Sequence, residues 1–133
     1  MKTPISYYGG KQNMVRHILP MFPQHKQYVE PFFGGGAVFF AKTPSSHEVI
    51  NDLDNRVINF YRVLQNNFED SQNLIKSTLH SEALYQYAKD ILDDDTISEV
   101  ERAWAFWVQT NMSFSKKIYA GFAFENNGLC CLS

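Results

Sequence analysis

The sequence is poor in several features that define whole classes of protein. It has two cysteines in 133 residues, Cys130 and Cys131, and adjacent cysteines without a nearby histidine suit neither a structural disulfide nor a zinc site. No segment approaches the roughly 20 consecutive apolar residues of a membrane span. The N-terminus also lacks the apolar core of a signal peptide. We therefore expect a cytoplasmic protein with no structural metal and no membrane partner.

The chain also lacks an excess of positive charge. Its formal net charge is −2 at pH 7, so the overall charge gives no sign of nucleic-acid binding, and any DNA contact must come from a local basic groove. The composition, 44% hydrophobic and 20% charged, is typical of globular proteins and argues against disorder. The length is that of a single domain.

The most informative segment runs from Gln27 to Phe40. A short apolar run of the length of a buried strand leads into Gly34-Gly35-Gly36, and an apolar segment that can start a helix follows. Strand, glycine turn and helix in this order form the ligand-binding corner of nucleotide-binding α/β domains. The dinucleotide fingerprint G-x-G-x-x-G is absent, and Glu30 just before the turn is poorly placed for a pyrophosphate. A neutral or cationic nucleoside suits this corner better.

Two further segments can contribute to the same corner. Lys11 follows Gly9-Gly10 at the start of a helix that we expect to extend to Leu19, so its side chain can point into a site. A second short strand ends at Asp52, 22 residues after Glu30, which is about the interval at which α/β folds place a carboxylate for the ribose hydroxyls. Local sequence alone favours a solvated lysine at position 11, and it leaves a helix-cap role open for Asp52.

Helical spacing of apolar residues dominates the rest of the chain. The pattern predicts helices around residues 57–64, 74–79, 84–92 and 100–111, the last of them preceded by a capping box of Ser98 and Glu101. Trp104 and Trp107 fall on one face of that helix, which predicts a core position rather than base stacking. The run of aspartates at 93–95 has no metal-site spacing and predicts a solvated acidic turn.

Cations and aromatics are mixed after this helix. Lys116 and Lys117 lie among Phe114, Tyr119 and Phe122, a combination that holds phosphates and stacked bases in nucleic-acid-binding proteins. A loop anchored by its aromatic side chains explains the pattern equally well. Lys116 and Lys117 are therefore the candidate DNA-binding residues.

Three blocks of the sequence resemble one known family when they are taken together. Tyr7-Tyr8-Gly9-Gly10-Lys11, the segment from Val29 to Phe40, and Asn51-Asp52 resemble the Dam-like DNA adenine-N6 methyltransferases in order and spacing. The resemblance covers the first half of the chain well and the helical remainder loosely. It implies S-adenosylmethionine as cofactor and DNA as partner. The cofactor-binding residues that it implies are Tyr7, Lys11, Glu30, Pro31, Phe32, Gly34, Gly35, Gly36 and Asp52.

The implied fold is α/β, with a partial Rossmann-like sheet of the S-adenosylmethionine-dependent methyltransferase type in residues 1–68. A helical subdomain in residues 69–133 would lead toward target recognition. The implied activity is site-specific methyl transfer to adenine N6 in DNA, as in restriction-modification systems.

An Asp-Pro-Pro-Tyr motif, with which the family binds the flipped adenine, does not occur in the sequence. No catalytic residue can therefore be named. We expect the cofactor-binding part of a longer enzyme: a truncated gene, a remnant, or a subunit that a second chain completes. Two alternatives stay open, namely non-catalytic binding of S-adenosylmethionine or DNA, and an unrelated α/β protein that binds another nucleotide.

Overall fold

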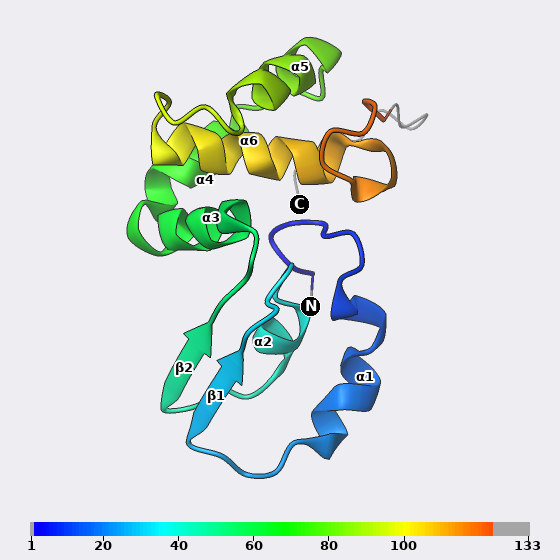
Figure 1. The fold of residues 1–133 in the computed structure, drawn as a ribbon, viewed down its shortest axis with the longest axis vertical. Helices are drawn as coiled ribbons and strands as arrows, with labels where there is room; N and C mark the ends of the chain where they lie inside the picture. The colour runs from blue at the N-terminus through cyan, green and yellow to red at the C-terminus, as the bar shows by residue number, and fades with distance from the viewer. Residues whose placement is uncertain (1, 124–133) are drawn as a thin grey trace.

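The computed structural model describes residues 2–123 (Figure 1). Cys130 and Cys131 lie outside this range. A small α/β part and a larger helical part follow each other along the chain, with η denoting short 3-10 helices. The elements are η1 (Lys11–Asn13), α1 (Val15–Ile18), η2 (Leu19–Met21), β1 (Gln27–Glu30), α2 (Ala37–Ala41), β2 (His47–Ile50), α3 (Asn55–Asn66), α4 (Phe68–Lys76), α5 (Glu82–Ile91), α6 (Glu99–Met112) and η3 (Phe114–Lys116).

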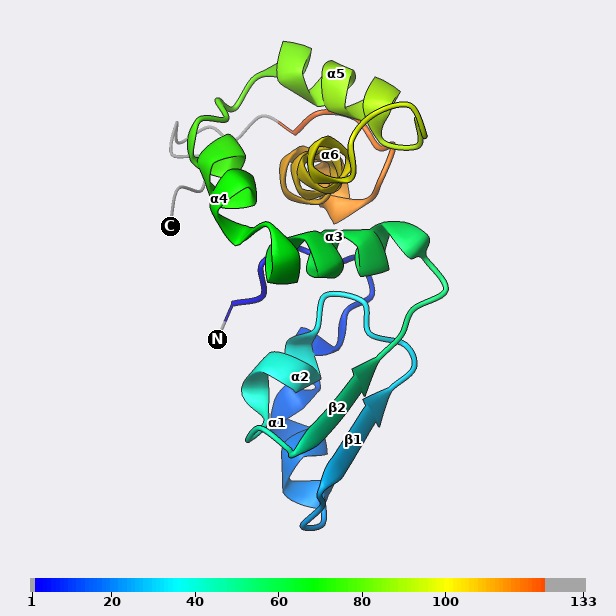
Figure 2. The ribbon, with the colours of Figure 1, turned by 90° about the vertical axis from the view of Figure 1, so that its left-hand side faces the viewer.

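The two strands form a parallel sheet and pair from Gln27 opposite His47 to Glu30 opposite Ile50. The helix α2 lies in the crossover between them, and Figure 2 shows α1 and α2 together on one side of the strands. Alternation along β1 buries Tyr28 and Glu30 on the covered side. Val29 and Val49 are 54% and 49% exposed. The predicted α/β class is confirmed as a helix-rich fold with a small parallel sheet, and the assignment of these strands to a partial Rossmann-like sheet stays a prediction.

The N-terminal helix is more broken than the sequence pattern predicts. Instead of one helix from Lys11 to Leu19, the chain forms η1, the single turn of α1 and then η2. Met14, an apolar residue within this segment, is 54% exposed. The segment is short and Pro20 interrupts its hydrogen bonding, so it forms only single turns.

In the helical part, α6 is the central element. Figure 2 views it nearly end-on, with α3, α4 and α5 around it. All residues from Ala103 to Thr110 are buried, because neighbours surround the helix instead of covering one face. Trp104 and Trp107 are 9% and 8% exposed, which confirms the predicted core role. Ser98 caps the helix as predicted, since its Oγ accepts a hydrogen bond of 3.2 Å from the Glu101 N–H.

An aromatic contact joins the two parts. The Phe33 and Tyr61 rings meet edge to face with centroids 4.8 Å apart, and the Tyr61 hydroxyl donates to Gly35 O at 2.8 Å. Phe60, the neighbour of Tyr61 on α3, contacts Phe106 of α6. The glycine turn is therefore held directly by the helical part, and the domain boundary predicted after residue 68 stays a prediction.

Candidate functional site

The carboxyl ends of β1 and β2 are tied together by backbone hydrogen bonds. The N–H of Asn51 donates to Glu30 O at 2.9 Å, and the N–H of Phe33 donates to Asn51 O at 3.0 Å. This pairing brings the chain after each strand to the same edge of the sheet. The glycine turn and Asp52, which are far apart in sequence, become neighbours there. In parallel α/β sheets this edge is where ligands bind.

Asp52 connects the two loops through its carboxylate. Its Oδ2 accepts from the Gly34 N–H at 2.8 Å, and its Oδ1 accepts from the Asp54 N–H at 2.9 Å. A carboxylate offers about four acceptor positions, so acceptor capacity remains for a ligand. The side chain is half-buried. The helix-cap role belongs to Asp54, whose Oδ1 accepts from the Arg56 N–H at 3.0 Å at the start of α3.

Tyr7 lies against the glycine turn. A Cβ atom on Gly34 would stand 3.2 Å from Tyr7 Cδ1, and one on Gly35 would stand 3.1 Å from Tyr7 Cβ. Gly34 and Gly36 also have φ values of 55° and 74°, which side chains disfavour. Glycine is therefore required both for the turn and for the close approach of Tyr7. Burial raises the pKa of the Tyr7 hydroxyl, and the carboxylates of Asp52 and Asp54 raise it further.

Lys11 and Glu30 form an ion pair beside the same turn. Lys11 Nζ lies 3.0 Å from Glu30 Oε1 and donates to Phe32 O at 2.6 Å. The Tyr28 hydroxyl donates to Glu30 Oε2 at 2.8 Å. The Glu30 side chain is 7% exposed and that of Lys11 is 36% exposed. Glu30 is thus a buried anchor, and Lys11 is the member of the pair that a ligand can reach.

Exposed apolar side chains flank this corner. Phe32 is 68% exposed directly before the buried Phe33, and Leu53 is 85% exposed directly after Asp52. Pro31 is also exposed. The sequence analysis did not identify Leu53 as a candidate site residue. Its position as an apolar residue directly after Asp52, at the end of a strand, could have indicated it. Two exposed apolar groups next to hydrogen-bonding groups suit a flat, partly apolar ligand such as a nucleoside.

An open pocket of about 800 Å³ lies beside the glycine turn. The pocket lies between the two parts of the chain. One wall comes from the N-terminal segment and the glycine turn, and the other comes from α6 and the loop that follows it. The residues that line it are Lys2, Thr3, Pro4, Ser6, Tyr7, Gly10, Gln12, Gly35, Ala37, Trp107, Asn111 and Lys116.

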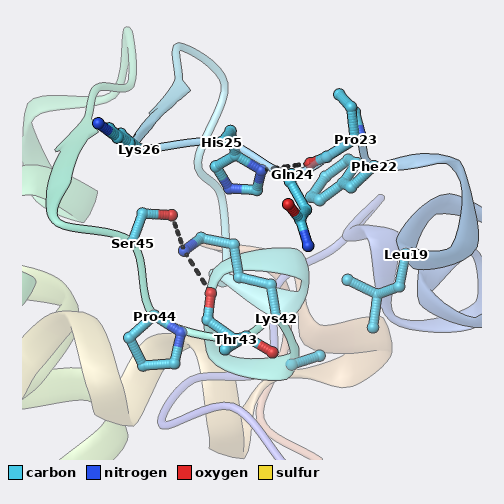
Figure 3. A pocket seen from close by; sticks show the side chains of 11 residues that line it. Leu19, Phe22, Pro23, Gln24, His25, Lys26, Lys42, Thr43, Pro44 and Ser45 are labelled. Atoms are coloured by element: carbon cyan, nitrogen blue, oxygen red, sulfur yellow. Dashed lines mark hydrogen bonds between the residues drawn. The ribbon is translucent and has the colours of Figure 1, made fainter.

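A second pocket lies at the opposite end of the strands, between the segments that precede β1 and β2 (Figure 3). Its central polar group is Lys42, whose ammonium donates to Thr43 O at 3.1 Å and to Ser45 Oγ at 3.2 Å, as Figure 3 shows. Lys42 also forms an ion pair with Glu48, and the side chain of Lys42 is 2% exposed. This lysine stabilises the loop, and the pocket lies away from the edge where parallel sheets bind ligands.

The structure separates the two lysines that were predicted to bind DNA. Lys116 Nζ donates to Asn111 O at 2.9 Å and lines the first pocket. Lys117 is exposed, and its Nζ stands 4.3 Å from the centroid of the Tyr8 ring. Their binding to DNA stays a prediction.

The loop that carries these lysines is held in an unusual backbone conformation. Ser115, Lys116 and Tyr119 have φ values of 57°, 57° and 62°, a region that non-glycine residues rarely adopt. The fully buried Gln109 of α6 accepts from the Tyr119 N–H at 3.2 Å. No sequence pattern indicated this strain, because it depends on the tertiary contact with α6.

Each aspartate of the 93–95 run has its own partner. Asp93 binds Arg56 and Tyr119, Asp94 binds Thr96, and Asp95 binds Arg102. Within residues 2–123 no group of three or more His, Cys, Asp or Glu side chains is arranged to hold a metal ion. In the same range no helix has the length and apolarity that a bilayer crossing needs.

Comparisons with known proteins identify the family of this chain. The family model for D12 class N6 adenine-specific DNA methyltransferases matches residues 7–129. A type II methyltransferase of Lactococcus lactis subsp. cremoris, M1.LlaDCHI, is 35% identical over 115 residues, which cover 80% of this chain and 39% of that protein. The DNA N-6-adenine-methyltransferase of Escherichia phage P1 is 40% identical over 57 residues, 43% of this chain and 7% of the relative.

A DNA adenine methylase of Vibrio cholerae serotype O1 is 34% identical over 61 residues, 46% of this chain and 22% of that enzyme. The chain thus spans well under half the length of each of these relatives. The family match covers all three blocks of the candidate corner, from Tyr7 to Asp52, and continues through α6. The chain belongs to the D12 class N6 adenine-specific DNA methyltransferase family.

Proposed function

We propose that the corner formed by the glycine turn, Asp52, Tyr7 and Lys11 binds S-adenosylmethionine. The observation that carries this proposal is the hydrogen bond from Gly34 N to Asp52 Oδ2. It places a carboxylate with free acceptor positions beside a turn without side chains, at the carboxyl end of a parallel sheet. This arrangement fits a ribose held by its hydroxyls with the rest of a nucleoside against the turn. The sheet would then be part of a Rossmann-like methyltransferase sheet.

Each residue has a distinct role in this proposal. Asp52 accepts hydrogen bonds from the ribose hydroxyls, and Phe32 with Leu53 contacts the adenine faces. Gly34 to Gly36 admit the cofactor against the backbone. Glu30, which the family resemblance places among the cofactor-binding residues, acts by fixing Lys11, and Pro31 directs the chain out of β1. An aromatic side chain such as Tyr7 adds a cation–π interaction of roughly 0.5–2 kcal/mol with the sulfonium.

The activity that we propose for the complete enzyme is site-specific methylation of adenine N6 in DNA. S-adenosylmethionine supplies an activated methyl group to the weakly nucleophilic amino nitrogen. Membership of the D12 family supports this activity, and the relatives described above are named as a type II methyltransferase, a DNA N-6-adenine-methyltransferase and a DNA adenine methylase. Such an enzyme would work in the cytoplasm, with DNA as its partner. A second chain, or a further segment, would supply the acceptor-binding residues.

A non-catalytic role is the alternative that one observation favours. The sequence contains no Asp-Pro-Pro-Tyr tetrapeptide, so this chain can hold the methyl donor without orienting an adenine. In that case it would bind S-adenosylmethionine or DNA and regulate a complete homologue. Turnover by the chain together with a complementing segment distinguishes an enzyme part from a binding protein.

Calorimetric titration of the purified chain tests the cofactor. We expect S-adenosylmethionine to bind and NAD and ATP to bind at least about tenfold more weakly, because the corner lacks the glycine pattern that holds a pyrophosphate. A preference for NAD or ATP would instead identify an α/β protein that uses this corner for another nucleotide. Asp90→Ala serves as the matched control for carboxylate loss, since Asp90 is exposed on α5.

A further inference from the structure

The pocket between the glycine turn and α6 is lined by basic side chains and by no acidic one. Lys2 and Lys116 both line it, together with the polar residues Thr3, Ser6 and Asn111. No aspartate or glutamate is among its lining residues. In the part of the chain that the structure describes, neither lysine takes part in an ion pair. Two cations without counterions therefore share one cavity in a chain whose net charge is negative.

Lys116 keeps hydrogen-bonding capacity for a ligand. Its ammonium has three N–H donors, and the bond to Asn111 O uses one of them. Two other polar residues of the lining are joined to each other, because Ser6 Oγ donates to Asn111 Oδ1 at 3.2 Å. The hydrogen bond to Asn111 O also places the cation at the last turn of α6, where it complements the helix dipole. Helix capping alone, however, does not account for a second lysine in the pocket.

The backbone holds Lys116 in this position at a cost. Its φ of 57° lies in the left-handed region, and such strain persists where surrounding contacts enforce it. Those contacts are present, since the Lys116 N–H donates to Ser113 O and the Tyr119 N–H donates to buried Gln109. The direction of the Lys116 side chain is therefore determined by the fold of the whole loop.

We propose that this pocket is a binding site for one oxyanion, which Lys116 and Lys2 neutralise. Tyr7 and Gly35 belong both to the pocket and to the candidate cofactor corner, so the anion is part of a ligand that also reaches that corner. Two ligands carry such a group: S-adenosylmethionine through its carboxylate, and the DNA backbone through a phosphate. The identity of the ligand rests on the proposed function, whereas the anion site itself does not.

Inorganic phosphate is the probe that tests the site without the proposed function. Binding is followed by amide chemical shifts of the pocket residues as phosphate is titrated at constant ionic strength. We expect saturable shifts in the wild-type protein, a loss of affinity of about tenfold in Lys116→Met, and recovery in Lys116→Arg. Lys76→Met, on the exposed end of α4, is the matched control and should leave the titration unchanged.

Three further ligands identify the source of the anion. If it is the cofactor carboxylate, Lys116→Met weakens S-adenosylmethionine about tenfold but leaves decarboxylated S-adenosylmethionine unchanged. If it is a DNA phosphate, the variant binds S-adenosylmethionine normally, and its affinity for a short duplex falls. The slope of that affinity against the logarithm of salt concentration then decreases by about 0.9.

The two proposals fail in different ways. If the wild-type protein binds phosphate in a Lys116-dependent manner but does not bind S-adenosylmethionine, the anion site stands and the proposed function is wrong. If S-adenosylmethionine and the duplex bind, but Lys116→Met changes none of the affinities for phosphate, cofactor or duplex, the anion site is wrong. Correct folding of each variant is checked by its amide spectrum away from the pocket.

Discussion

Asp52 Oδ2 accepts a hydrogen bond of 2.8 Å from the backbone N–H of Gly34, so the carboxylate after β2 directly orients the glycine turn after β1. Through Oδ1 the same side chain also receives the Asp54 N–H. Asp52 is therefore a structural link between two loops as well as the candidate ribose ligand. A substitution at this position is expected to affect both roles, and they can be measured separately.

Asp52→Ala should abolish measurable binding of S-adenosylmethionine while the protein still folds. Losing a charged hydrogen-bond partner typically costs roughly 1.5–3 kcal/mol, and the variant also leaves the N–H groups of buried Gly34 and of Asp54 without their acceptor. Calorimetry gives the affinity, and urea unfolding gives the change in stability. Unchanged affinity, at the level of the Asp90→Ala control, would remove Asp52 from the site.

Lys11→Met should weaken S-adenosylmethionine binding more than Lys42→Met does. Lys11 lies at the corner, and its side chain is 36% exposed. Lys42 lies in the loop that precedes β2, and its side chain is 2% exposed beside Glu48. Lys42→Met should instead lower the free energy of unfolding, because it removes the hydrogen bonds that the buried Lys42 ammonium donates to Thr43 O, Ser45 Oγ and Glu48. Equal effects of the two variants on affinity would reduce Lys11 to a structural residue.

A double-mutant cycle separates the ion-pair role of Lys11 from its contact with a ligand. Lys11→Met leaves the buried Glu30 carboxylate without its cation, so adding Glu30→Gln should restore part of the lost stability. It should not restore affinity if Lys11 contacts the cofactor. Recovery of both stability and affinity would mean that Lys11 acts only through Glu30.

The Lys42–Glu48 pair should make stability depend on pH on the acid side. The hydrogen bond from Lys42, together with that from the Ser45 N–H, lowers the pKa of Glu48 below its usual value of 4.5. The unfolded chain therefore binds the proton more readily, so this contribution is complete above about pH 4.5 and is lost as the pH falls through the folded-state pKa. Asp94 has a lowered pKa as well, so the measurement is the difference between wild type and Glu48→Gln in urea unfolding from pH 3 to 7.

Alanine at three glycines should distinguish backbone strain from steric contact. Gly121→Ala should be nearly neutral, because nothing lies within 4 Å of the added Cβ. Gly9→Ala adds only the cost of a left-handed φ of 73°, about 1 kcal/mol. Gly36 has a similar φ, and in Gly36→Ala the added Cβ would also lie 2.7 Å from Phe33 Cζ. We therefore expect this variant to lose about 2 kcal/mol or more of folding stability. Thermal unfolding ranks the three, and equal losses at Gly9 and Gly36 would contradict the packing described for the turn.

This chain alone should not methylate DNA. Methyl transfer requires an extruded adenine held by its amino group, and correct orientation contributes up to roughly 7–11 kcal/mol of the barrier in well-aligned systems. The purified chain is incubated with labelled S-adenosylmethionine and an adenine-containing duplex, and label transfer is measured with host methylases excluded. Stoichiometric transfer would reveal an acceptor site within these 133 residues.

The local elements of the protein follow from its sequence. Apolar periodicity predicted α3, α5 and α6, and the glycine turn with its flanking residues predicted the β1–α2 corner. The helix predicted at residues 74–79 lies earlier in the chain, as α4 at Phe68–Lys76. Ser98 predicted the cap of α6. These features depend on interactions within a few residues, so the pattern along the chain contains the information needed to place them. The three blocks that resemble the methyltransferases were recognisable for the same reason, since each is a continuous segment.

Only the tertiary structure determined which side chains of those segments are buried and which partners they contact. Lys42 and Lys11 look alike in sequence, yet one is buried against Glu48 and the other joins Glu30 at the candidate site. Lys116 and Lys117 are neighbours in sequence, but a left-handed backbone held by Gln109 directs one to a pocket and the other to Tyr8. Burial and ion pairing depend on atoms that are distant in sequence, and no local pattern contains them.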